Sequence, residues 1–360
     1  MAKTGTSSIQ ESLKGFGDSD WIWLTEERRR PNHIVAFTDI AAAATNAGTV
    51  KSRNVATFDT LVQSLGRRTL LMSSEGILKL PIDDLRNFRA YAQKQGIGDT
   101  KIVAYVRSPI EYLTSLARAK MGGMLTTLNL KNTKTRYRER FENFDLVFGR
   151  ENVELWKFDS RTFVRGCVVQ DFCARIGVNF PADKVIRANE SLSREAVGLF
   201  YIYRKYADPG ALEKTSTGPG RLRLVNQLAR IGQKKLRFAP ELAAPVLDNN
   251  RADIAWMEER LGQPLADRLG EPQADDIRSE QDLLRTDPAT VEELRTLLGA
   301  AAPQGIRGET PEEIATLVAA LWHVEKPAAR RVAAEQPGLI RSMLARINRT
   351  FATTDNDRAN

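Results

Sequence analysis

Short apolar runs alternate with amphipathic segments in the first half of the chain. Three runs rich in aliphatic, β-branched and aromatic residues predict strands: TLLMSS at 69–74, KIVAYV at 101–106 and NVELWKF at 152–158. A segment with helical periodicity follows each run: 81–95, 109–121 and 162–176, the last closed by Gly177. Strands that alternate with helices predict a parallel sheet that binds ligands at the carboxyl ends of its strands.

Helical patterns continue on both sides of this region. Residues 31–47 and 54–65 predict two more helices before the first of these strands. Beyond about residue 190 no strand is predicted, and four segments have helical patterns: 191–206, 251–262, 287–298 and 310–324. Between them, a stretch rich in Gly, Pro and basic residues at 210–224 predicts a loop. We therefore expect an α/β protein with a helical C-terminal half.

Composition narrows the class of ligand. The 360-residue chain is 42% apolar, which is enough for one large core domain and an accessory piece. Its net charge of +8 suits an anionic ligand or substrate. Cys167 and Cys173 have a spacing that fits neither a metal site nor a disulfide framework. No apolar run approaches the roughly 20 residues of a membrane span, so we expect a cytoplasmic protein.

The stretch KTGTSS at residues 3–8 has the composition of an anion-binding loop. Lys3 supplies a positive charge, and Gly5 lets the backbone approach an oxyanion closely. Thr6, Ser7 and Ser8 offer hydroxyl and amide groups. An amphipathic helical pattern follows, and the N-terminus of a helix favours negative charge. The stretch therefore predicts a site for a phosphate-type group.

A second anion-binding pattern follows the strand KIVAYV. Arg107 stands at the carboxyl end of this strand, and Ser115 lies eight residues later in the helix that Pro109 opens. A guanidinium can bind a phosphate with two parallel hydrogen bonds, and a serine hydroxyl can bind another of its oxygens. With the first loop this gives two separate anion sites, as a nucleotide with phosphates at both ends of its ribose requires.

These two elements together resemble the sulfotransferases that use 3′-phosphoadenosine 5′-phosphosulfate (PAPS), in particular the bacterial carbohydrate-type members. AKTGTSS is similar to their 5′-phosphosulfate loop, (P/A)K(T/S)GT(T/S), and RSPIEYLTS is similar to their 3′-phosphate element. Further likeness lies in NHIVAF, SSEGIL, RANESLS and DIAWMEERLG. The resemblance covers about residues 1–265 and is specific because two independent phosphate elements occur in the right order.

The resemblance implies a P-loop-type parallel sheet flanked by helices, in a sulfotransferase-like α/β domain at 1–265. Residues 266–352 are then expected to form a helical C-terminal extension, and 353–360 a disordered tail. It also implies a soluble enzyme with a small-molecule nucleotide donor, PAPS, and an acceptor hydroxyl, by default of a saccharide. Basic residues are dispersed without interleaved aromatic residues, so no nucleic-acid partner is expected.

The mechanism that the resemblance implies is in-line transfer of a sulfuryl group, which needs no metal. Lys3 would neutralise the charge that develops on the leaving phosphate oxygen, while the loop from Gly5 to Ser8 holds the 5′-phosphate and Arg107 with Ser115 holds the 3′-phosphate. The acceptor alcohol needs a general base. Glu75, at the end of LLMSSE, is the first candidate and His33 the second.

Family members carry a strand before the loop, and only Met1 and Ala2 precede it in this sequence. Either the chain begins at an internal methionine through a misplaced start, or it is a truncated version. We favour the misplaced start, which predicts that the upstream DNA encodes, in frame, about 5–8 apolar β-branched residues and a Gly-containing turn. Without that strand, its neighbours in the sheet would keep unpaired backbone groups.

Two other classes of function stay open at this point. A P-loop nucleotide kinase would place lysine late in the loop, whereas here it comes first. A catalytically inactive relative could serve as a basic binding module for acidic polymers. Secondary candidates for ligand contact are Asn189, Ser191 and Arg221, while His323 and Trp256 are expected to pack in the interior.

Overall fold

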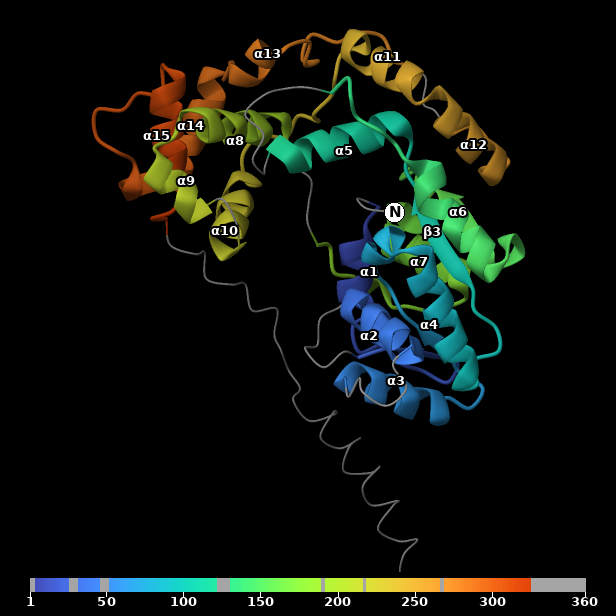
Figure 1. Ribbon diagram of the computed structural model, residues 1–360. Coiled ribbons are helices and arrows are strands. Elements are labelled where there is room, and N and C mark those ends of the chain that lie inside the picture. Colours follow the sequence, from blue (N-terminus) through green and yellow to red (C-terminus); the bar gives the residue numbers. More distant parts are fainter. Residues whose placement is uncertain are drawn as a thin grey trace, which may run out of the picture. The chain divides into compact units, whose positions relative to one another are not determined.

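The computed structural model describes residues 4–25, 32–45, 52–121, 130–188, 192–215, 218–265 and 269–324. Its main compact unit covers Met1–Trp322. Within the described ranges the protein is a mixed α/β structure with two small parallel sheets (Figure 1). None of the described helices combines the length and the apolar character needed to cross a membrane.

Strands and helices alternate in the first half. The elements there are α1 (Thr6–Leu13), β1 (Trp21–Trp23), α2 (Ile34–Thr45), α3 (Arg53–Gln63), β2 (Thr69–Leu71), η1 (Gly76–Lys79), α4 (Ile82–Lys94), β3 (Ile102–Val106), α5 (Pro109–Met121), α6 (Tyr137–Phe148), η2 (Arg150–Asn152), β4 (Val153–Lys157), η3 (Val164–Gly166) and α7 (Val168–Ile176). The three predicted strands and the helices after them are therefore confirmed.

The second half contains helices and short 3₁₀ turns. They are η4 (Ala182–Lys184), α8 (Arg194–Tyr206), α9 (Pro209–Thr215), α10 (Gly218–Leu228), α11 (Pro240–Asn249), α12 (Arg251–Leu261), α13 (Glu280–Leu284), α14 (Pro288–Leu298), η5 (Gly299–Ala301) and α15 (Pro311–Ala320). The loop predicted at 210–224 is wrong, because α9 and most of α10 occupy it. Pro219 stands in the first turn of α10, where its missing N–H costs no helical hydrogen bond.

The strands form two parallel pairs. β1 pairs with β2, with Trp21 opposite Thr69 and Trp23 opposite Leu71. β3 pairs with β4, with Val106 opposite Lys157. β1 was not predicted, because a three-residue strand is too short to show a periodic pattern. The prediction of parallel strands combined with helices is therefore confirmed.

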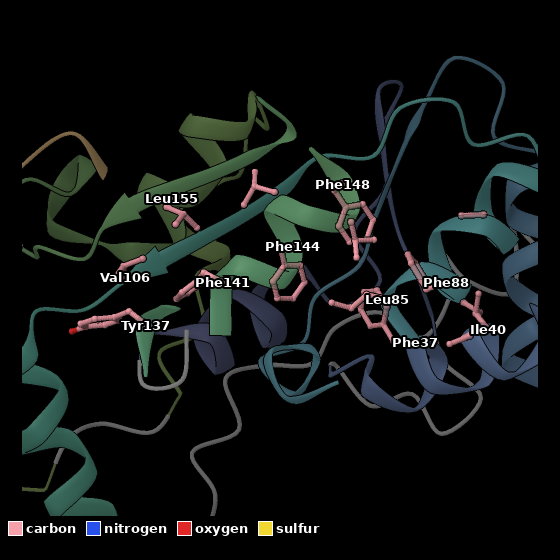
Figure 2. Packing of buried hydrophobic residues seen from close by; sticks show 14 of the residues in the cluster. Phe37, Ile40, Leu85, Phe88, Val106, Tyr137, Phe141, Phe144, Phe148 and Leu155 are labelled. Atoms are coloured by element: carbon pink, nitrogen blue, oxygen red, sulfur yellow. The ribbon is translucent and has the colours of Figure 1, made fainter. Parts of the chain in front are cut away.

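Both strand pairs contribute to the same two apolar clusters. The larger cluster combines β2, β3 and β4 with α2, α3, α4, α6 and α12. Figure 2 shows its centre, where Phe141, Phe144 and Phe148 of α6 lie between the strands and the residues Leu85 and Phe88 of α4. The second cluster joins α1 and α7 with residues from all four strands, so the two pairs share helical cover on both faces.

Helix α8 is the centre of the second half. Its buried side chains include Leu199, Phe200, Tyr201, Ile202 and Tyr203. α13 and α15 pack against it, as does α5 from the first half (Figure 1). Nearly every residue of α8 from Ala196 to Arg204 is buried, so this part of the helix is covered on most of its faces.

Candidate functional site

The beginning of α1 forms a tight loop against α7. Gly5 has a φ of 74°, and a Cβ atom added to it would lie 2.6 Å from Cγ1 of Val168. No acidic residue stands in the first turn of α1, and Thr6 and Ser7 are half-buried there. The first N–H groups of a helix have no partner within the helix, and together with the helix dipole they favour an anion. Lys3 lies outside the described residues.

The side chain of Ser8 contacts the segment that follows α7. Its Oγ accepts a hydrogen bond from the amide of Ala188 at 3.0 Å and donates to the carbonyl of the same residue at 3.2 Å. One turn later, Ser12 Oγ accepts from the amide of Ile186 at 2.8 Å. The two serines thus attach the segment 186–188 to the exposed side of α1, directly before Asn189 and Ser191, which lie outside the described residues.

Gln10 connects α1 to the carboxyl end of β2. It is buried, and its Nε2 donates to Ser73 Oγ at 3.2 Å and to the Ser73 carbonyl at 3.3 Å. Ser74 Oγ donates to Asn32 at 2.7 Å and accepts from the amide of Gly76 at 3.0 Å. Glu75 lies between these anchored residues with its side chain exposed. A rigid backbone thus presents the Glu75 carboxylate to solvent at the end of β2.

His33 is part of the interior. It is fully buried, its Nδ1 accepts a hydrogen bond from the amide of Ser73 at 2.9 Å, and its ring lies 4.8 Å from that of Trp23. Burial lowers the pKa of His33 to about 4. An acceptor alcohol has no access to this imidazole, so the geometry favours Glu75 over His33 as the base.

Arg107 is held at the carboxyl end of β3 by three neighbours. Phe158 follows β4 and lies opposite Arg107 in the parallel register, and the Arg107 guanidinium sits 4.7 Å above the centre of its ring. Arg107 Nε donates to Glu111 at 3.2 Å, and Tyr137 Oη donates to the Arg107 carbonyl at 2.7 Å. Ser115 is buried two turns into α5. The predicted pair therefore stands on one strand end and the helix after it.

The segment 158–168 contacts both of the elements that were predicted to bind anions. Its first residue, Phe158, carries Arg107 and packs edge-on against Phe163 at 4.9 Å. Its last residue, Val168, touches Gly5. The loop at α1 and the guanidinium of Arg107 thus rest on the two ends of one eleven-residue segment.

Two residues that hold the candidate site in place were not predicted from the sequence. Phe158 is recognisable once the strand register is known, since it is the residue opposite Arg107. Gln10 has no such signal, because its partner Ser73 is remote in sequence. Of the secondary candidates, Arg221 lies in α10, Trp256 packs against the larger core cluster, and His323 is exposed, contrary to the packed position expected for it.

Among the residues that the structure describes, no group of three or more His, Cys, Asp or Glu side chains could hold a metal ion. No protein-family model, curated protein or solved structure matches the chain.

Proposed function

We propose that the protein is a sulfotransferase that moves a sulfuryl group from PAPS to an acceptor hydroxyl, by default of a saccharide. The observation that carries the proposal is the common anchor of two anion-binding elements. Segment 158–168 supports the helix N-terminus at Gly5 at one end and the Arg107 guanidinium at the other. A nucleotide with a phosphate on each side of its ribose needs such a pair of sites.

The residues present suit this donor. The loop at Gly5 packs too closely against Val168 for any side chain, and Gly5 itself offers no side chain to cap α1. The first amides of α1 would therefore bind a phosphate group. Arg107 is stacked on Phe158 and only 19% exposed, a setting in which a guanidinium–phosphate contact is stronger than in water. Ser115, on the following helix, supplies a hydroxyl for the same phosphate.

The chemistry needs a base and a cation from the chain itself. When bound, PAPS supplies the sulfuryl group, whose bond to the 5′-phosphate oxygen breaks as the acceptor oxygen bonds to sulfur. Glu75 takes the proton that the acceptor hydroxyl loses. Lys3 and the amides at the start of α1 stabilise the negative charge that the leaving phosphate oxygen gains.

The test is sulfuryl transfer from labelled PAPS to a panel of saccharide acceptors, without added metal. Glu75→Gln should lower turnover roughly 10²–10⁴-fold, the range for losing a general acid–base group, and leave PAPS affinity unchanged. Glu259→Gln, an exposed change on α12, serves as the matched control and should behave like the wild type. Magnesium-dependent ATP turnover without PAPS binding would identify a kinase instead, and polymer binding without either nucleotide would identify a binding module.

A further inference from the structure

Asp171 of α7 is a buried carboxylate that joins this helix to β3 and to η3. It is 2% exposed. Its Oδ2 accepts hydrogen bonds from Oη of Tyr105, on β3, and from Nε of Arg175 at 2.7 Å. Its Oδ1 accepts from the amide of Val164, in η3, at 3.3 Å. Burial and the nearby carboxylate raise the pKa of Tyr105, so its hydroxyl keeps the proton that it donates to Asp171.

This contact does more than fill the core. A buried ion pair, such as that of Asp171 with Arg175, often stabilises a protein no better than apolar side chains of the same volume. Hydrogen bonds, however, require a narrow range of distances and angles, whereas apolar contacts have no preferred direction. The bond from Tyr105 to Asp171 therefore fixes the place of α7 along β3.

Helix α7 and strand β3 each support one of the two predicted anion-binding elements. Val168, the first residue of α7, touches Gly5. Tyr105 stands two residues before Arg107, and both side chains contact Phe158. The Tyr105 ring packs edge-on against it at 5.9 Å, and the Arg107 guanidinium lies 4.7 Å above its centre. A bond that fixes α7 against β3 therefore also fixes the loop at Gly5 against the Arg107 guanidinium.

We propose that Asp171 is a positioning residue that sets the spacing between the loop at Gly5 and the Arg107 guanidinium. The proposal rests on the proposed function, because this spacing matters only if one ligand binds both elements. Two linked contacts reinforce each other only where the geometry allows both at once, and binding groups must be held to within about 0.5 Å. Asp171 itself acts through Tyr105 and Val164 and does not touch the ligand.

The first arm of the experiment measures, by calorimetry, the affinities of the full chain for adenosine 3′,5′-bisphosphate and adenosine 5′-phosphate. Asp171→Asn keeps the shape of the side chain but replaces one acceptor oxygen by a donor nitrogen, so it cannot accept on both sides. The variant should bind adenosine 5′-phosphate like the wild type. Its preference for the bisphosphate should fall about tenfold, the equivalent of one charge-assisted contact. Tyr105→Phe, which removes only the hydroxyl, should do the same.

Asp276→Asn is the matched control. Asp276 is also a buried carboxylate that pairs with a partly exposed arginine, Arg237 at 2.9 Å, and accepts from a backbone amide, that of Gln273 at 2.8 Å. Its substitution should lower the unfolding temperature as Asp171→Asn does and leave the preference for the bisphosphate intact. If Asp171→Asn were destabilised but kept the preference, the positioning role would be overturned and the proposed function would stand. Equal affinities of the wild type for the two nucleotides would contradict the proposed function instead.

A second arm tests the link without any nucleotide, by amide exchange of the ligand-free chain. The Ile9 amide donates to the Gly5 carbonyl at 3.1 Å and so reports on the loop at α1. Asp171→Asn should speed exchange at Ile9 together with exchange at Val164, whereas Asp276→Asn should change neither. Faster exchange at Val164 with unchanged exchange at Ile9 would show that Asp171 does not hold the loop at Gly5. That result would overturn the proposal whatever the nucleotide affinities are.

Discussion

Gly5 is the residue whose size matters most for the loop at α1. Its φ of 74° costs another residue about 1–2 kcal/mol, and a methyl group would overlap Val168 at 2.6 Å, which adds about 1–3 kcal/mol. Gly5→Ala should therefore lower the free energy of unfolding by about 2–5 kcal/mol in urea denaturation. Gly15→Ala is the control, because Gly15 has a φ of 73° with no atom within 4 Å. Equal losses in the two variants would show that the contact with Val168 is unimportant.

His33 should make stability depend on pH. Burial holds its pKa near 4 in the folded protein, whereas the unfolded chain binds the proton near the ordinary value of 6.5. The unfolded state therefore binds more protons between these values, and stability falls as the pH drops from about 6.5 to about 4. The total loss is about 3 kcal/mol.

Urea denaturation at several pH values checks this dependence. His33→Asn keeps a side-chain acceptor for the Ser73 amide but cannot titrate, so the loss between pH 6.5 and 4 should shrink by about that amount. His323→Asn, at an exposed position, should retain the full dependence. An unchanged slope in His33→Asn would show that other groups cause it.

At the scale of elements, α12 fixes the beginning of α6 and through it the backbone of Arg107. Asp253 of α12 accepts hydrogen bonds from the amides of Tyr137 at 2.7 Å and Arg138 at 2.9 Å. Tyr137 in turn donates to the Arg107 carbonyl. Asp253→Ala should cost about 1–2 kcal/mol of stability, as the loss of a helix cap does, and weaken binding of 3′-phosphorylated nucleotides.

Denaturation and calorimetry on the same samples check both effects. Asp248→Ala removes an exposed ion pair with Arg251 on neighbouring helices and should change stability by less than about 0.5 kcal/mol. If Asp253→Ala lowered stability without any change in nucleotide affinity, the link from α12 to Arg107 would be absent.

The elements that were predicted correctly are those with a periodic pattern over many residues. β3 and α5 follow from KIVAYV and the segment opened by Pro109, and their junction places Arg107 where the sequence predicts it. The three residues of β1 are too few for a pattern. The glycines and the proline of 210–224 are typical of a loop, so the two helices there, α9 and α10, were not predicted. The burial of His33 and the contact of Gln10 with Ser73 depend on tertiary packing, which a local pattern does not contain.

At the scale of the whole molecule, the described strands form two separate parallel pairs. Among the described strands, β2 and β3 each have one neighbour, although both contribute to the same two clusters. Inner strands of a parallel sheet are covered on both faces. Strands β2 and β3 are only half-buried at Leu70, Leu71, Val103 and Ala104. The helix α1 packs on residues of both pairs and covers this region.

The most direct test of the two-anion account is a comparison of two nucleotides by calorimetry. If the loop at Gly5 and the arginine site at Arg107 bind the two ends of one ligand, adenosine 3′,5′-bisphosphate should bind about 10- to 100-fold more tightly than adenosine 5′-phosphate. Arg107→Ala should remove most of this preference and leave the affinity for adenosine 5′-phosphate unchanged. Equal affinities of the wild-type protein for the two nucleotides would contradict the account.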